Sequence, residues 1–264
     1  MSDFPQHSVT RRRIDSAVSV VSWLLLAALV SGQEAKLEQR PMILSSAPLA
    51  IVLEKEAKLV LRGNFLDEIT AVKVVSTENI TVEVVSKCKT PVPQNYDAKR
   101  AGDTLAEIKF FLPKETCAGK LSLTAESAHG VSPVYEIIVL APDELIEERE
   151  PNDSFKSPQI ISVGKTIVGN IGDARNVDVF QVEFLAGQQV SIETIAARVG
   201  SLLDSTLTLY DSKGRIVAAN DDHAGTRDSR IDLTVTLAGT YFVTVHDAND
   251  AGGLHFAYRL KLTP

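Results

Sequence analysis

The sequence has little tryptophan, cysteine or histidine, and each shortage excludes a kind of site. The one tryptophan, Trp23, lies in an N-terminal apolar run, so no indole remains for a sugar-stacking platform. The two cysteines, Cys88 and Cys117, have no histidine pair nearby, which makes a Cys/His zinc site a poor fit. The five histidines are scattered along the chain.

An excess of positive charge is also missing. The 264 residues carry a formal net charge of −7. A nucleic-acid partner requires a basic patch that neutralises phosphates, so we expect no such partner. The sequence contains no His-Glu-x-x-His zinc motif, phosphate loop, dinucleotide fingerprint or Gly-x-Ser-x-Gly elbow. We therefore expect a protein that is not an enzyme. The alternative is a secreted hydrolase with a dispersed active site, because catalytic triads assemble from distant residues.

No apolar run reaches the ~20 residues that a membrane-spanning helix needs. The candidate, Ala17 to Val30, has 14 residues, follows Arg11-Arg12-Arg13 and ends in small residues at Gly32. This pattern is typical of a secretory signal peptide, here residues 1–32, before a polar tail at 33–40. We expect a secreted, periplasmic or cell-surface protein with no membrane span in the mature chain. An uncleaved anchor is the alternative, and the export route (general or twin-arginine) stays open.

The first half of the remaining chain is patterned for strands. Short runs rich in β-branched residues alternate with turn residues, and they predict an immunoglobulin-like sandwich over residues 41–141. The expected strands are 51–53, 58–61, 71–75, 81–85, 106–112, 120–125 and 134–140. Two cysteines in an exported protein favour a disulfide, so we expect Cys88 to pair with Cys117; two separate buried thiols are the alternative.

The second half alternates apolar and polar residues more strictly. Tyr241, Val243 and Val245 form one example of the period-two pattern that gives a strand a single core face. About eight such strands predict a jelly-roll-like sandwich over residues 148–264, joined to the first by an acidic linker at 142–147. The fold class we predict is therefore all-β, with two antiparallel sandwich domains after a signal peptide.

An acidic run joins the two halves. Residues 143–153 hold six carboxylates in eleven residues. Within the run Glu148, Glu150 and Asn152 alternate, so in an extended chain their oxygens share one face. Ca²⁺ binds six to eight such oxygens at roughly 2.3–2.6 Å. The alternative is a plain solvated linker.

A second polar cluster, Asn220-Asp221-Asp222-His223, is either another cation site or, as we prefer, a turn capped by its own side chains.

The first half weakly resembles the immunoglobulin-like domains of the transcription-factor type, the TIG or IPT family. The residues that carry the resemblance are Pro48 and the stretch Leu59-Val60-Leu61-Arg62-Gly63-Asn64-Phe65-Leu66. The resemblance implies a spacer or interaction domain.

The second half resembles the bacterial pre-peptidase C-terminal domain family. The matching residues are Glu150-Pro151-Asn152-Asp153, Gly169-Asn170-Ile171, Asp178-Val179-Phe180, Ala186-Gly187, Leu203-Asp204, Leu207-Thr208-Leu209-Tyr210-Asp211, Gly214, Asn220-Asp221-Asp222, Ala238-Gly239-Thr240-Tyr241 and Tyr258-Arg259-Leu260. The resemblance implies a non-catalytic β-sandwich found in exported proteins, which binds Ca²⁺ in some members and collagen in clostridial collagenases.

The resemblance also implies a ligand set. Glu148, Glu150, Asn152 and Asp153 match the family's acidic run, and Asp178 matches the aspartate of the second-strand motif. Arg175 stands where a further acidic ligand is expected, and the nearby Asp173 is the candidate substitute.

These observations predict an exported binding or accessory protein with a Ca²⁺-stabilised module. The expected partner is an unknown extracellular protein or a cell-wall or matrix component. An adhesin for protein or carbohydrate is a further alternative, and it would need an exposed aromatic patch. Tyr210, Tyr241 and Tyr258 are the candidates for that patch.

Overall fold

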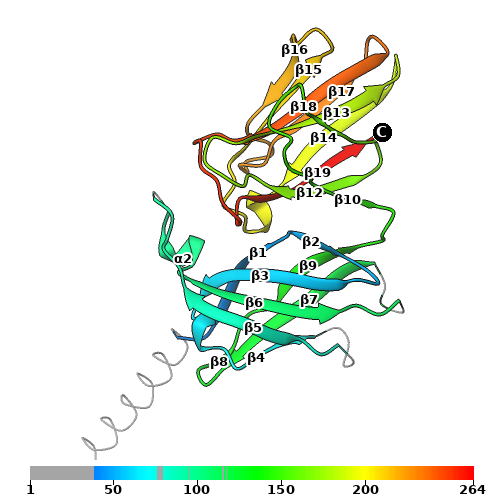
Figure 1. The fold of residues 1–264 in the computed structure, drawn as a ribbon. Helices are drawn as coiled ribbons and strands as arrows, with labels where there is room; N and C mark the ends of the chain where they lie inside the picture. Colours follow the sequence, from blue (N-terminus) through cyan, green and yellow to red (C-terminus); the bar gives the residue numbers. More distant parts are fainter. Residues whose placement is uncertain (1–38, 76–79, 95, 115, 117) are drawn as a thin grey trace, which may run out of the picture. The chain divides into compact units, whose positions relative to one another are not determined.

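The computed structural model describes residues 39–264 except 76–79, 95, 115 and 117 (Figure 1). The predicted signal peptide, the polar tail up to residue 38 and Cys117 lie outside the described residues. Cys88 is exposed on a strand, and its predicted disulfide with Cys117 stays a prediction. Within the described part of the chain, no helix is long and apolar enough to cross a membrane.

Two sheets make up the first half of the described chain. One has the strand order β1-β3-β6-β5, and the other has the order β2-β9-β7-β4 with the short β8 paired to β7. Their facing side chains form a core around Leu59, Leu61, Ile108 and Leu123, all fully buried. The strands are β1 Met42–Ala47, β2 Ala50–Val52, β3 Glu56–Asn64, β4 Ala71–Val74, β5 Glu83–Lys89, β6 Thr104–Phe111, β7 Gly119–Ser127, β8 Gly130–Val131 and β9 Tyr135–Leu140.

Two five-stranded sheets make up the second half. Their orders are β10-β12-β19-β14-β17 and β11-β13-β18-β15-β16. The strands are β10 Leu145–Glu147, β11 Gln159–Ile160, β12 Thr166–Asn170, β13 Val177–Phe184, β14 Gln189–Ile195, β15 Ser205–Asp211, β16 Ile216–Asn220, β17 Arg230–Thr234, β18 Gly239–Asp247 and β19 Ala257–Thr263. Three short helical turns complete the described elements: η1 Leu66–Glu68, α2 Ala98–Ala101 and η2 Ala197–Val199.

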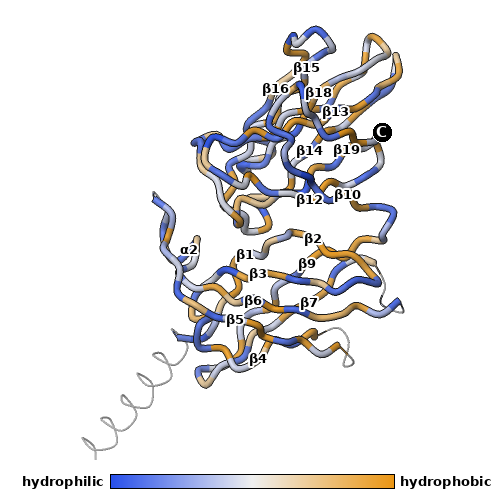
Figure 2. The backbone as a smooth tube through the Cα atoms, viewed as in Figure 1, coloured by the Kyte–Doolittle hydropathy of each residue, from blue (hydrophilic) through white to orange (hydrophobic). Residues whose placement is uncertain are grey.

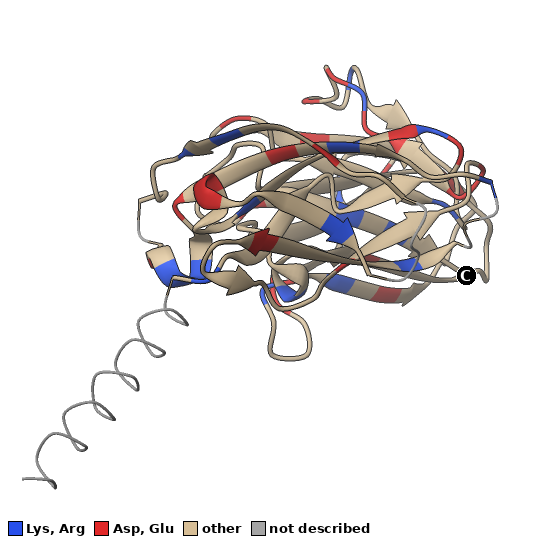
Figure 3. Ribbon diagram, turned by 90° about the horizontal axis from the view of Figure 1, so that it is seen from below, with Lys and Arg blue, Asp and Glu red and all other residues tan. Residues whose placement is uncertain are grey.

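The period-two patterns form strands as predicted. On β18, Tyr241, Val243 and Val245 enter the core of the second half, while the alternating Phe242 and Thr244 belong to the other face. Figure 2 shows the same alternation of hydrophobic and hydrophilic segments along the strands. Charged residues of both signs are interspersed over the strands in the view of Figure 3. The predicted all-β sandwich class is confirmed.

Three short edge strands differ from the antiparallel expectation. β2 pairs in parallel with β9, β10 with β12, and β11 with β13. Each has only two or three residues, too few to display a periodic pattern. Leu145–Glu147 thus form β10 inside the predicted acidic linker, so part of that segment is a strand. The predicted domain boundaries stay a prediction.

Candidate functional site

The acidic segment runs along the edge of the second half rather than through open solvent. After β10, the backbone N–H of Glu148 donates to the carbonyl of Val168 at 3.0 Å, which extends the pairing with β12. Further on, the carbonyl of Asn152 accepts from the N–H of Val179 on β13 at 2.9 Å. The segment therefore bridges β12 of one sheet and β13 of the other.

Three carboxylates meet at this bridge. One oxygen each from Glu148, Glu150 and Asp178 lies within 4.8 Å of the others. Asp178 is fully buried, Glu148 is half-buried and Glu150 is exposed. At 4.8 Å two unit charges repel by roughly 3 kcal/mol for an effective dielectric constant of about 20. The cluster therefore needs a proton or a cation to neutralise it.

Glu148 is the best anchored of the three. Its Oε1 accepts from the phenol of Tyr258 at 2.8 Å and from Nδ2 of Asn152 at 3.1 Å. Its Oε2 accepts from the backbone N–H of Asn170 at 2.9 Å. A Cβ built on Gly169 would lie 2.7 Å from the Glu148 Cδ atom, so a larger residue at this strand position would require the Glu148 side chain to move. The chain thus holds the Glu148 carboxylate in one place.

Glu150 is held more loosely, at the exposed end of the cluster. Its Oε2 accepts from the backbone N–H of Asn152 at 3.0 Å, and its Oε1 accepts from Nδ2 of Asn176 at 3.2 Å. Partial burial, with the negative charges of Asp153 and Glu148, raises the pKa of Glu150 despite these hydrogen bonds.

Asp178 is the buried member of the cluster. The Tyr258 phenol lies 2.6 Å from Asp178 Oδ2 and is itself fully buried. Burial, followed by the hydrogen bond and charge of Glu148, raises the pKa of Asp178 to about 10. Burial and the Asp178 charge also raise the pKa of Tyr258. In the absence of a cation Asp178 therefore holds a proton at neutral pH.

Two buried oxygens in the cluster lack a partner among the described residues. They are Oδ1 of Asn152 and Oδ1 of Asp178, in side chains that are fully buried. A buried polar atom without a hydrogen bond is costly, so such atoms need an explanation. Carboxylate and amide oxygens gathered at one point are the donors that a hard cation such as Ca²⁺ uses. The residues therefore fit that ion.

The predicted ligand set is only partly gathered by the structure. Glu148, Glu150, Asn152 and Asp178 come together, as the preceding contacts show. Asp153 is exposed and acts on the cluster through its charge. Asp173 is also exposed, in a turn where its carbonyl accepts from the N–H of Asn176.

Sequence reasoning missed three residues at this site: Tyr258, Asn176 and Gly169. The sequence gives one indication for Tyr258. Its position in the period-two pattern of β19 predicts that its side chain points inward. That signal contradicts its candidacy for an exposed patch. Tyr241 is also buried, so of the three patch candidates only Tyr210 reaches the surface. Nothing in the sequence marks Asn176, which comes from the loop before β13.

The second polar cluster forms a turn. Asn220 Oδ1 accepts from the backbone N–H of Arg230 at 2.8 Å, and His223 pairs with Thr226 as an isolated bridge. The backbone pairing of His223 with Thr226 forms a turn, whereas capping by the cluster's own side chains stays a prediction.

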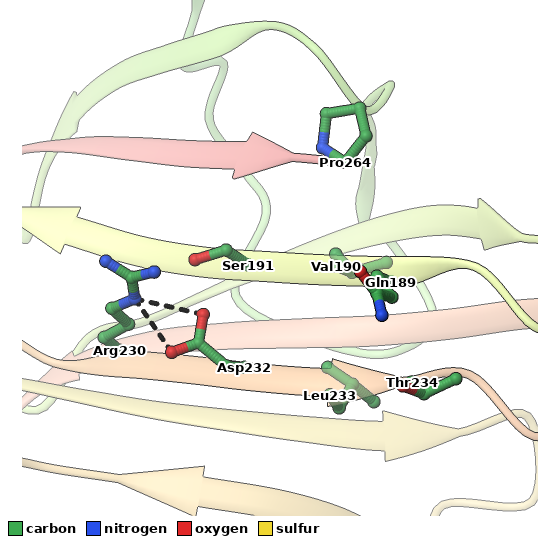
Figure 4. A pocket seen from close by; sticks show the side chains of 8 residues that line it. All are labelled: Gln189, Val190, Ser191, Arg230, Asp232, Leu233, Thr234 and Pro264. Atoms are coloured by element: carbon green, nitrogen blue, oxygen red, sulfur yellow. Dashed lines mark hydrogen bonds and ion pairs between the residues drawn. The ribbon is translucent and has the colours of Figure 1, made fainter.

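A surface hollow of the second half lies away from the acidic cluster. It has a volume of about 500 Å³ and lies over β14 and β17 (Figure 4). In it Arg230 Nε donates to both carboxylate oxygens of Asp232 at 3.0 Å. The other lining residues are Gln189, Val190, Ser191, Leu233, Thr234 and Pro264. The ion pair satisfies its own charges and leaves no titratable group free for chemistry.

Comparison with curated proteins finds a relative that is much longer than this chain. A probable subtilase-type serine protease of Deinococcus radiodurans is 34% identical over 142 residues, or 52% of this chain and 19% of the relative. The chain thus spans about a fifth of the length of the curated relative it matches.

Two solved structures are similar to parts of the chain. The pre-peptidase C-terminal domain of a collagenase from Bacillus anthracis aligns with 44% of this chain and 99% of its own, at 15% identity and a TM-score of 0.34. A Bacteroides ovatus protein of a mixed-linkage glucan utilization locus, solved with a mixed-linkage heptasaccharide, aligns with 79% of this chain and 74% of its own. Its identity is 9% and its TM-score 0.27.

A family model matches the middle of the second half. Residues 176–247, from the residue before β13 to the end of β18, match the model described as the bacterial pre-peptidase C-terminal domain. The match includes Asp178 and excludes Glu148, Glu150 and Tyr258. The resemblance to the TIG or IPT family stays a prediction. Residues 176–247 thus carry a bacterial pre-peptidase C-terminal domain match, and the predicted resemblance is confirmed there.

Proposed function

We propose that this chain is an exported, non-catalytic accessory protein whose second half is a binding module stabilised by Ca²⁺. The observation that carries the metal part is the pair of buried, unpartnered oxygens on Asn152 and Asp178 beside the carboxylates of Glu148 and Glu150. The family match at 176–247 supports the accessory role. The exposed Asp153, which acts on the cluster through its charge, is the candidate for a further ligand, and Asp173 is a second candidate.

The ion would act by replacing the mutual repulsion of the clustered carboxylates with attraction to a shared positive charge. When bound, Ca²⁺ supplies positive charge that the clustered carboxylates attract. The chain's own contribution is to hold the oxygens in place: Tyr258 orients Glu148 and Asp178, and Asn170 fixes the second oxygen of Glu148. Because the ion binds only the folded state, it should raise stability by about 2.7 kcal/mol at a hundredfold excess over the dissociation constant. Mg²⁺ should substitute poorly, because it demands a tighter octahedral shell.

An adhesin is the second candidate function, and one observation favours it. Tyr210 lies on the outer face of its sheet with Phe155 packed edge-on against it, the ring centroids 5.1 Å apart. Phe155 is 47% exposed, so apolar aromatic surface is open to a partner. The partner would be an extracellular protein or carbohydrate.

The metal site is tested by calorimetric titration of the full-length chain with Ca²⁺ and by melting in Ca²⁺ and in chelator. The wild type should give binding heat and a higher melting temperature in Ca²⁺. Glu150→Gln and Asp178→Asn should lose both. Glu136→Gln, which alters an exposed carboxylate paired with Lys120 on β7, is the matched control and should behave as the wild type. Equal melting temperatures in Ca²⁺ and in chelator, with no binding heat, would mean that the acidic run is a plain solvated linker.

A further inference from the structure

The outer face of the sheet β11-β13-β18-β15-β16 carries a cross-strand row of apolar side chains that ends at the polar Gln181. Tyr210 pairs directly with Phe242, and Phe242 pairs with Gln181. On the other side Tyr210 pairs with the exposed Ile216. Directly paired residues of neighbouring strands place their side chains on the same face. Val243, which follows Phe242 on β18, lies in the core. Because successive strand residues point to opposite faces, Phe242 and its row face outward.

Phe155 covers the aromatic part of the row. Its ring meets Tyr210 at a centroid distance of 5.1 Å and an interplanar angle of 85°. It meets Phe242 at 5.4 Å and 76°. Both are edge-to-face arrangements of the kind that aromatic pairs favour. Phe155 thus lies across the seam between β15 and β18.

The contacts of the turn around Phe155 are otherwise local. The N–H of Ser157 donates to the carbonyl of Ser154 at 3.0 Å, and the two hydroxyl oxygens lie 3.0 Å apart. Residues 153–157 are all exposed. The aromatic contacts are therefore the main attachment of this turn to the sheet among the described residues.

The turn is tied at its start to the acidic cluster. Asn152, whose side chain enters the cluster, precedes Phe155 by three residues. Three residues span at most about 11 Å, even when fully extended. The carbonyl of Asn152 also accepts a hydrogen bond from the N–H of Val179. Val179 belongs to the cross-strand row adjacent to the row of Phe242 and Tyr210. The position of Asn152 therefore restricts where the ring of Phe155 can lie.

We propose that a cation at Glu148, Glu150 and Asp178 controls whether Phe155 covers the Tyr210–Phe242 pair. This inference rests on the proposed function. With the ion bound, Asn152 is fixed and the ring stays seated on the sheet. Without it, Asp178 holds a proton, the carboxylates of Glu148 and Glu150 still repel each other, and the buried oxygens of Asn152 and Asp178 draw in water. The segment from the exposed Glu150 onward loosens, and Phe155 leaves with it. Cation loss thus uncovers an aromatic surface on the outer face.

The test places a fluorescent reporter on the turn of the full-length chain. Trp23 is the only tryptophan, so a Trp23→Phe background is free of indole. Phe155→Trp in that background reports on the turn. Phe111→Trp is the matched control, because Phe111 is an exposed residue (56%) on β6, in the other half of the chain. Acrylamide quenching is measured in Ca²⁺ and in chelator, with calorimetry on the same samples.

We expect the quenching constant of Phe155→Trp to rise at least twofold in chelator, and that of Phe111→Trp to stay unchanged. The larger tryptophan ring could pack differently from Phe155, so hydrogen exchange of the unmodified chain serves as a second readout. Residues 152–157 should exchange faster in chelator. Binding heat without either change would overturn the inference and leave the proposed metal site intact. No binding heat would overturn both.

Discussion

The phenolic oxygen of Tyr258 lies 2.6 Å from Oδ2 of Asp178, and both side chains are fully buried. The same phenol lies 2.8 Å from Glu148. A phenol has a single proton to donate, so it cannot satisfy both carboxylates at once. The carboxylate that the phenol leaves without a donor must be neutralised by a proton on Asp178 or by a cation.

Tyr258→Phe should weaken the site while keeping the core packed, because the ring is unchanged. The variant leaves Asp178 Oδ2 buried without its hydrogen-bond partner, which should cost about 1–3 kcal/mol of unfolding free energy in chelator. Ca²⁺ affinity should also fall, because Glu148 and Asp178 lose their shared orientation. Urea unfolding and calorimetry measure the two effects. Tyr241→Phe, which removes a phenol bonded to the Leu237 carbonyl at 2.8 Å, is the control for Ca²⁺ affinity. An unaltered affinity in Tyr258→Phe would contradict the positioning role.

The stability of the cation-free protein should depend on Asp178 and on pH. Its folded pKa of about 10 lies above the unfolded value near 3.8, so the folded state binds more protons between them. The contribution of Asp178 is therefore fully present below about pH 4 and is lost as the pH rises towards 10. The loss is at most about 1.4 kcal/mol per pH unit. Asp178→Asn cannot titrate there, so in chelator the wild type should lose stability relative to this variant from pH 5 to 9. Parallel curves for the two proteins would be evidence against a protonated Asp178.

Gly169→Ala should displace the Glu148 carboxylate, because the new Cβ would lie 2.7 Å from the Glu148 Cδ atom. Overpacking of this kind typically costs about 1–3 kcal/mol. We expect that loss together with a fall in Ca²⁺ affinity of tenfold or more. Gly172→Ala is the matched control, since a Cβ at Gly172 would lie at an ordinary 3.7 Å from Asn170 Nδ2. If both variants bind Ca²⁺ as the wild type does, Glu148 has more freedom than the structure indicates.

The predicted Cys88–Cys117 disulfide can be tested by thiol labelling. Cys88 is exposed, so as a free thiol it should react at once in the folded protein. We expect no labelling before reduction and two labelled thiols after it. Closing this loop should contribute about 3–4 kcal/mol to stability. Rapid labelling of Cys88 in the non-reduced protein would show that the bridge is absent.

Much of the fold could be predicted from alternation alone. The runs around Val243 on β18 and Leu260 on β19 became strands with the predicted inward faces, because a half-buried strand needs period-two hydrophobicity. β10 and β11 could not be predicted. Each is too short to show a period, and each forms only because a longer strand offers its edge.

The sequence by itself determined that an acidic segment with alternate oxygen donors precedes the second half, since Glu148, Glu150 and Asn152 follow from spacing alone. The family resemblance alone indicates Asp178, and only the tertiary structure decided that Tyr258 also meets them. Asp178 and Tyr258 come from two different sheets, and Gly169 leaves room for Glu148. Local pattern says whether a side chain faces inward. Which polar atoms it then meets depends on strand order and register, which are set by packing over the whole core.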